Sequence, residues 1–180
     1  SSSKITSLNF ESHKITIRKE DIVISSIPAT ALASILGERI NLSFRGVRSQ
    51  YLFFENKKIL PQKYNWVYIS DPNLSFNRIT EPSSMASSVC PKDHTYICIE
   101  TTYNVDKRPN TSPDSYKVIL NWLRSQKGFS SEGFISDLNT FNYEDYVYPI
   151  QDKNYRGELA KYNSITSGIS NLFTLGTGGE

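Results

Sequence analysis

Tyr51-Leu52-Phe53-Phe54 decides the fold class of this 180-residue chain, because large apolar side chains fill both alternating positions of an extended segment. The same period of two returns in Trp66-Val67-Tyr68-Ile69 and in Tyr96-Ile97-Cys98-Ile99. Aromatic and β-branched residues at this spacing are typical of strands. Residues 48–102 therefore predict a sheet with apolar side chains on both faces, and the segment from Phe134 to Tyr148 predicts one further long strand.

Two helices are predicted to flank this sheet. Ser112 and Pro113 are typical of a helix start, and Gly128 of a helix end. The residues between them place an apolar stripe on one side of the helix: Tyr116, Ile119, Leu120 and Leu123. A second stripe, in residues 153–167, consists of Tyr155, Leu159 and Tyr162. The fold class is therefore α+β, a largely antiparallel mixed sheet with flanking helices.

One face of the predicted sheet can be covered by the helix that begins after Ser112, so the other face needs an explanation of its own. Its apolar side chains either form a core against another domain or line an aromatic substrate cleft. The residues alone leave both interpretations open.

The first forty residues predict short strands and one short helix. Ile5 to Leu8 and Ile15 to Ile17 are strand-like and are joined by a turn around Glu11-Ser12-His13. The unbroken apolar run from Asp21 to Pro28 predicts a strand covered on both faces, as in a parallel sheet. Pro28 suits a first helical position, and the helix is expected over the stretch from Ala29 to Leu36.

Composition excludes several classes of protein. The chain has 20 basic and 18 acidic side chains without a basic cluster, which argues against nucleic acid as a partner. No apolar run approaches the roughly 20 residues that a membrane span needs. The two cysteines, Cys90 and Cys98, have no metal-ligand companions at a suitable spacing, and one disulfide would be a thin framework for a secreted domain. We therefore expect a cytoplasmic protein without a metal site.

Side-chain catalysis has little support in the sequence. His13 and His94 are isolated in expected turns, and Cys98 lies in an apolar run that suits a core position. No Ser-His-Asp arrangement, metal-binding histidine pair or paired carboxylates stand out. This pattern agrees with an enzyme whose cofactor carries the chemistry.

Three segments in a fixed order carry a resemblance to a known family: Phe76-Asn77-Arg78-Ile79-Thr80-Glu81-Pro82, then Tyr148-Pro149-Ile150-Gln151-Asp152-Lys153, then Asn171-Leu172-Phe173-Thr174-Leu175-Gly176. Together they resemble the C-terminal half of the FAD-dependent amine oxidase-like superfamily. Within it, they are most similar to UDP-galactopyranose mutases and to the protoporphyrinogen oxidase-like proteins of polysaccharide gene clusters. The resemblance implies the substrate domain of an FAD-dependent oxidoreductase.

The same resemblance implies two substrate-binding residues. Arg78 matches the arginine that the mutases place on the diphosphate of a nucleotide sugar, and a guanidinium offers a planar fork to phosphate oxygens. Tyr148 matches a tyrosine whose hydroxyl reaches a phosphate. The plainer interpretations are that Arg78 faces solvent and pairs loosely with Glu81, and that Tyr148 packs beside Pro149.

Two glycines near the end of the sequence are implied to bind the cofactor. Family members follow an apolar strand with Gly-Arg-x-Gly, which lets the backbone approach the flavin. Gly176 and Gly179 match that pattern, whereas Thr177 replaces the arginine. An ordinary glycine turn is the alternative.

The chain lacks the Gly-x-Gly-x-x-Gly turn that holds the FAD pyrophosphate in this family. We therefore expect an internal fragment in which residues 1–45 and 168–180 are remnants of the FAD-binding domain and residues 46–167 form the substrate domain. Such a fragment is expected to be inactive alone and to lose FAD on purification, although the parent would bind it. Its exposed strand edges are expected to favour self-association.

Two functional hypotheses follow from the sequence. The first is a fragment of an FAD-dependent oxidoreductase or nucleotide-sugar mutase that binds an anionic small molecule and acts in polysaccharide or lipopolysaccharide biosynthesis. The second is a free-standing module, derived from such an enzyme, that binds a ligand or partner without catalysis. The serine-rich stretch at residues 83–88 departs from the mutases and leaves the substrate undefined.

Overall fold

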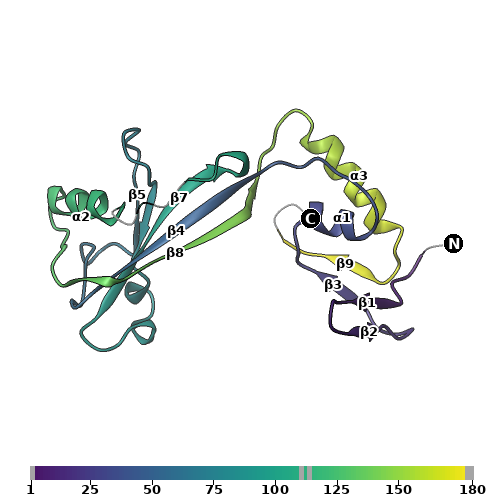
Figure 1. Cartoon of the computed structure of the whole chain (residues 1–180), viewed down its shortest axis with the longest axis horizontal. Coiled ribbons are helices and arrows are strands. Elements are labelled where there is room, and N and C mark those ends of the chain that lie inside the picture. Colours follow the sequence, from purple (N-terminus) through teal and green to yellow (C-terminus); the bar gives the residue numbers. More distant parts are fainter. Residues whose placement is uncertain (1–2, 110–111, 113–114, 177–180) are drawn as a thin grey trace. The chain divides into compact units, whose positions relative to one another are not determined.

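The structure is a computed structural model that describes residues 3–109, 112 and 115–176. The chain forms two compact units (Figure 1). Residues 46–145 make up one of them, which we call the sheet unit, and residues 1–45 and 146–180 make up the other, which we call the terminal unit. Each unit has its own cluster of buried apolar side chains, so each is described by itself.

The sheet unit is built on a five-stranded sheet with the strand order β5-β6-β7-β4-β8. Its strands are β4 (Phe44–Phe54), β5 (Trp66–Tyr68), β6 (Arg78–Thr80), β7 (Thr95–Asn104) and β8 (Phe134–Pro149). Strand β6 pairs antiparallel with β5 and with β7. This sheet confirms the predicted α+β class with a mostly antiparallel sheet.

Helix α2 (Ser115–Ser125) covers one face of the sheet, which we call the helix face. The apolar stripe of α2 packs there on the inward side chains of the strands. Residues buried in this core include Leu52, Phe54, Ile79, Ile97, Ile99, Ile119, Leu120 and Leu123. Each such side chain contributes about 1.5–3 kcal/mol when it leaves water, so this layer is the main stabilising element of the unit. Pro113, the expected first helical residue, lies outside the described residues.

Gly46 in β4 allows a close crossing on the helix face. A Cβ atom at this position would lie 2.4 Å from the Tyr103 ring, so no larger residue fits without displacing that ring. The Tyr103 hydroxyl in turn donates to Asp145 Oδ1 at 2.5 Å. This end of the sheet is thus closed by a tyrosine rather than by α2.

The terminal unit joins segments from both ends of the sequence. β1 (Ser7–Asn9) and β2 (Lys14–Thr16) form an antiparallel hairpin, and β3 (Val23–Ser25) pairs in parallel with β9 (Leu172–Thr174). Helices α1 (Ala29–Ile35) and α3 (Tyr155–Ser167) contact each other, and α3 also contacts β9. The core of the unit consists of Ala29, Leu32, Ala33, Ile40, Leu42, Phe44, Tyr162 and Leu172.

The strand at Asp21 to Pro28 pairs in parallel as predicted, but the expectation that both of its faces are covered is wrong for the described residues. Ile22 and Ile24 are 61% and 58% exposed. The register explains this, because Val23 lies opposite Leu172 and Ile24 lies opposite Phe173. The Val23–Leu172 side packs in the core, and the Ile24–Phe173 side is bare.

The division drawn from the sequence placed residues 146–167 with the middle of the chain, whereas the compact units place them with residues 1–45. Helix α3 accounts for this grouping. Tyr162 is buried in the terminal core, and the Glu158 carboxylate accepts the Asn41 backbone N–H at 2.7 Å.

The helices are short throughout. Among the described residues, 3-10 turns occur at Pro82–Ser84, Ser87–Val89 and Val105–Lys107. Of the α-helices as described, α3 is the longest, with 13 residues. Within the described residues, none of the helices has both the length and the apolar character that crossing a bilayer requires.

Candidate functional site

Strand pairing places Arg78 between one residue of each neighbouring strand. Arg78 lies opposite Tyr68 of β5 and opposite Glu100 of β7. Directly paired residues point to the same side of a sheet, so the three side chains share one face. This face is opposite to the helix face, because the next residue in β6, Ile79, is buried in the core beneath α2.

Aromatic side chains dominate the face that carries Arg78, which we call the aromatic face. It is formed by Tyr51, Phe53, Trp66, Tyr68 and Tyr96. The Phe53 and Tyr96 rings stack with centroids 5.5 Å apart, and Tyr51 lies 6.3 Å from Tyr96. Tyr68 is 70% exposed. The two sequence interpretations of this face, a core against another domain and a substrate cleft, both remain open.

The Arg78 guanidinium is already engaged on one edge. Its Nε and Nη2 atoms both donate to the Glu100 carboxylate, with 2.7 Å between Nη2 and Oε1. Its Nη1 atom donates to the Tyr68 hydroxyl at 3.3 Å, and its Cζ atom lies 5.8 Å from the centre of the Tyr68 ring. The bond to Glu100 raises the pKa of Arg78, against the opposing effect of burial. Arg78 is therefore a fixed cation whose Nη1 edge faces a tyrosine.

The sequence interpretation that paired Arg78 with Glu81 is wrong. Glu81 is fully buried and accepts the backbone N–H groups of Ile59 and Leu60 at 2.8 and 2.9 Å. It also accepts the Thr95 hydroxyl at 2.9 Å, and Lys58 Nζ lies 3.2 Å from its Oε2 atom. Since β6 side chains alternate, Arg78 and Glu81 project to opposite faces. Glu81 therefore anchors the loop at residues 57–60 and takes no part in the aromatic face.

Among the described residues, the aromatic face offers binding groups and no activated nucleophile. Burial raises the pKa of the Tyr51 and Tyr96 hydroxyls, so both are neutral donors at physiological pH. Burial also raises the pKa of Cys98 and of Cys90, which are free thiols. A protonated thiol is a poor nucleophile. The face can stack a flat ring and bind an anion, which is the chemistry of recognition.

Tyr148, the second predicted substrate residue, lies near the end of β8 and is about half exposed. It belongs to the terminal unit, and Arg78 belongs to the sheet unit. The expectation that both residues approach one ligand therefore stays a prediction.

Gly176, the first predicted cofactor residue, follows β9 with φ +107°, in the region that favours glycine. Apart from Gly176 itself and its chain neighbours, no atom of the described residues lies within 4 Å of the position that its Cβ would take. A ligand could therefore approach this backbone closely. Gly179 lies outside the described residues, and the cofactor role of both glycines stays a prediction.

Sequence reasoning missed Arg48, which is buried on the helix face beside a pocket. The sequence contained a sign of this burial. Side chains alternate between the two faces of a strand, so Arg48 and Gln50 point to the same face as the core residues Leu52 and Phe54. A charged residue at a core-facing position of a strand is rare unless it is paired, and it marks a place to look for a ligand.

Comparisons with known proteins bear on the fold. No protein-family profile and no curated protein sequence matches the chain. Among solved structures, the fold is similar to that of a reduced UDP-galactopyranose mutase, with 12% identity, a TM-score of 0.65, and coverage of 96% of this chain and 39% of that chain. It is also similar to a protein assigned as a protoporphyrinogen oxidase from Exiguobacterium sp. 255-15, with 11% identity, a TM-score of 0.60, and coverage of 98% of this chain and 42% of that chain. The chain spans about two fifths of the length of these proteins, and the likeness concerns the fold alone.

Proposed function

We propose that the chain is the substrate-binding part of a longer FAD-dependent oxidoreductase or nucleotide-sugar mutase, and that its aromatic face binds an anionic substrate. The observation that carries the proposal is a fixed arginine, Arg78, on an exposed aromatic surface whose fold is similar to part of a UDP-galactopyranose mutase. The role in polysaccharide or lipopolysaccharide biosynthesis rests on the resemblance of the three sequence segments.

The contacts of Arg78 define how it would hold a phosphate. Glu100 occupies the edge formed by Nε and Nη2, so the ligand takes the Nη1 edge together with the Tyr68 hydroxyl. Glu100 is thus a positioning residue that fixes the guanidinium at the cost of reducing its net charge. The exposed Tyr68 and Trp66 rings are placed to stack on a base or a sugar ring.

The described residues fit FAD in one respect. Among the described residues, none beyond the chain neighbours of Gly176 fills the place where its side chain would be, which suits the close approach of a cofactor at the end of β9. In the parent, FAD would supply the redox or sugar-transfer chemistry, while this chain would bind and orient the substrate. Gly179 and Tyr148 complete the proposal as cofactor- and substrate-binding residues.

A second candidate is a binding module without catalysis. The sheet unit favours it in one way, because it has its own core of buried residues from β4, β6, β7 and α2 and carries the whole aromatic face. Flavin distinguishes the two candidates. If the full-length gene product is purified without a stoichiometric flavin absorbance band, the binding module becomes the better assignment.

Titration of UDP and UDP-galactose into the chain and into its Arg78 variants tests the site. Arg78→Ala should weaken binding by about 1.5–3 kcal/mol, or about 10- to 150-fold, the range for a hydrogen bond to a charged group. Arg78→Lys should recover only part of this loss, because lysine keeps the charge and loses the fork. Glu100→Gln should bind at least as tightly as the wild type, since glutamine keeps an acceptor oxygen that positions the guanidinium and removes a competing negative charge.

Arg124→Ala is the matched control, because Arg124 is an exposed arginine on α2, against the other face of the sheet. Its affinity for both ligands should equal that of the wild type. Equal affinities for the wild type, Arg78→Ala and Arg78→Lys would remove Arg78 from the site.

A further inference from the structure

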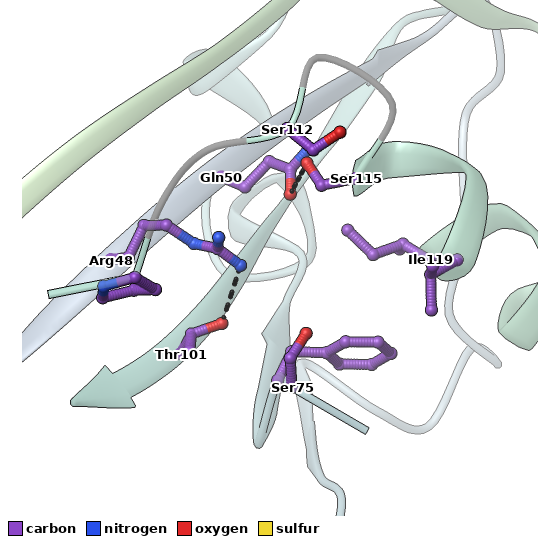
Figure 2. A pocket seen from close by; sticks show the side chains of 10 residues that line it. Arg48, Gln50, Ser75, Thr101, Ser112, Ser115 and Ile119 are labelled. Atoms are coloured by element: carbon purple, nitrogen blue, oxygen red, sulfur yellow. Dashed lines mark hydrogen bonds between the residues drawn. The ribbon is translucent and has the colours of Figure 1, made fainter. Parts of the chain in front are cut away.

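The helix face of the sheet unit contains a pocket that the proposed function does not use. It has a volume of about 350 Å³ and lies where α2 begins, beside strands β4 and β7 (Figure 2). Arg48, Thr101 and Gln50 form its polar side, and Phe76 and Ile119 form part of its apolar side. We propose that this pocket binds a small carboxylate with an apolar body, held by Arg48.

Arg48 is the residue that calls for a ligand. It is only 6% exposed, and its guanidinium has one hydrogen bond among the described residues, from Nη2 to the Thr101 hydroxyl at 3.1 Å. Its Nε atom is buried without a partner. No carboxylate in the described part of the chain pairs with it, and its Cζ atom lies 5.9 Å from the centre of the Phe141 ring. Arginine stays charged in proteins, so an uncompensated buried guanidinium is costly.

The geometry of the guanidinium favours a carboxylate. Nε and Nη2 form the side edge of the fork, and Nη2 keeps one hydrogen after its bond to Thr101. A carboxylate in the pocket would balance the charge of the guanidinium and accept the remaining Nη2 hydrogen in a charge-assisted hydrogen bond. Figure 2 shows Arg48 extending into the pocket, with Thr101 at its tip.

The amide of Gln50 is engaged at both ends and, being neutral, does not compensate the charge of Arg48. Its Nε2 atom donates to Asn139 Oδ1 at 3.0 Å, and its Oε1 atom accepts the Ser115 hydroxyl at 3.2 Å. Ser115 is also the first residue of α2, whose 11 residues direct their positive dipole end toward the pocket. Neither Gln50 nor the start of α2 supplies a negative charge, so an anion is what would balance the charge of Arg48.

One charge and an apolar wall define the ligand class. Arg48 is the cationic side chain among the described residues that line the pocket, so a monoanion balances it and a dianion such as phosphate leaves a negative charge poorly compensated. Phe76, Val118 and Ile119 oppose it with apolar surface. The volume is at the lower end of the roughly 300–1,000 Å³ typical of small-molecule sites.

Trp122 offers a direct readout, because its ring packs edge-on against Phe76 with centroids 5.9 Å apart. A Trp66→Phe background leaves Trp122 as the one tryptophan of the chain. Benzoate should change its fluorescence saturably. Benzamide, the neutral analogue of the same shape, and inorganic phosphate should each bind at least tenfold more weakly.

Arg48→Met should weaken benzoate binding at least tenfold in this background. Arg45→Met, the same change at an exposed position of the same strand, should leave it unaltered. Val118→Phe is the second variant, and it is safe for folding because Val118 is 52% exposed. The larger ring should narrow the pocket and weaken benzoate binding. When the three changes are made in the chain that keeps Trp66, the affinity of the aromatic face for UDP should be unaffected.

Several results would overturn the proposal. Equal benzoate affinity in the wild type and Arg48→Met would remove the arginine from the site, and benzamide or phosphate binding as tightly as benzoate would reject the ligand class. Asp114, which lies outside the described residues, supplies a last control. If benzoate bound only after Asp114→Asn, the partner of Arg48 would be a carboxylate of this chain and not a ligand.

Discussion

Arg78 and Arg48 lie on opposite faces of one sheet and differ in how their charges are compensated. Arg78, on the aromatic face, has a carboxylate on one edge and a tyrosine hydroxyl on the other. Arg48, on the helix face, is more deeply buried and has one hydroxyl partner among the described residues. The arginine that carries the family resemblance is thus the better satisfied of the two.

The difference shows that a motif and an unmet physical need are separate signals of function. Arg78 is recognised by its sequence neighbours, and its neutral pair with Glu100 would be stable without any ligand. Arg48 has no motif in the three recognised segments, but its buried Nε atom lacks a partner. Glu81 lies on the same helix face, and its buried carboxylate accepts hydrogen bonds from two backbone N–H groups and one hydroxyl.

The largest expected contrast between the two faces concerns stability. Leu123→Ala, at a fully buried position beneath α2, should lower the free energy of unfolding by about 2–5 kcal/mol, the range for large-to-small core substitutions. Tyr96→Ala, on the half-exposed aromatic face, should cost clearly less. Urea denaturation of both variants makes the measurement. A larger loss for Tyr96→Ala would mean that the aromatic face is a structural core.

Glu81→Gln tests the satisfied buried charge. Glutamine keeps one acceptor oxygen, so one of the two backbone N–H groups of Ile59 and Leu60 loses its partner, and Lys58 loses its counter-charge. We expect a loss of about 1–3 kcal/mol in the free energy of unfolding, the cost of leaving a buried donor unsatisfied. Glu100→Gln, on the partly exposed aromatic face, is the control and should cost less. Equal losses of unfolding free energy for Glu81→Gln and Glu100→Gln would show that burial does not make the Glu81 carboxylate more important for stability.

Replacement of each arginine by methionine should have effects of opposite sign. Arg48→Met removes a buried, poorly compensated charge and should raise the free energy of unfolding by about 1 kcal/mol, as apolar replacements of buried charges often do. Arg78→Met breaks the pair with Glu100 and should lower it by about 1 kcal/mol. Thermal unfolding without added ligand compares the two. Destabilisation by Arg48→Met would indicate that the protein itself compensates this arginine.

Local periodicity explains which parts of the fold could be predicted from the sequence. The strand at Tyr51 to Phe54 and the stripe of α2 follow from which side chains recur at spacings of two or of three to four, and both were predicted. The exposure of Ile24 was not, because one-sided coverage of β3 depends on α1 and α3, which come from distant segments. An apolar run alone cannot report whether a second layer is present.

The partners of charged residues were the least predictable feature. Glu81 is three residues from Arg78, whereas the actual partner, Glu100, is 22 residues away. The pairing register of β6 with β7 brings Arg78 and Glu100 together, and no local pattern encodes that register. The burial of Arg48 could have been inferred from the sequence, because it lies on the same side of the strand as Leu52. That its Nε atom has no hydrogen-bond partner depends on the positions of β7 and α2.

The last expected effect is a pH dependence on the helix face. Burial, together with the hydrogen bond to Asp145, raises the pKa of Tyr103 to about 12. The pKa in the folded state lies above the unfolded value of about 10, so the folded state holds the proton more tightly. The stability that this provides is fully present below pH 10 and is lost as the pH rises toward 12. Tyr103→Phe should therefore be less stable than the wild type at pH 8, and the difference should shrink between pH 10 and 12. Tyr68→Phe, at an exposed position of the aromatic face, serves as the control in the same urea titrations. If the difference in unfolding free energy between Tyr103→Phe and the wild type stayed constant across this range, the Tyr103–Asp145 bond would not hold the proton.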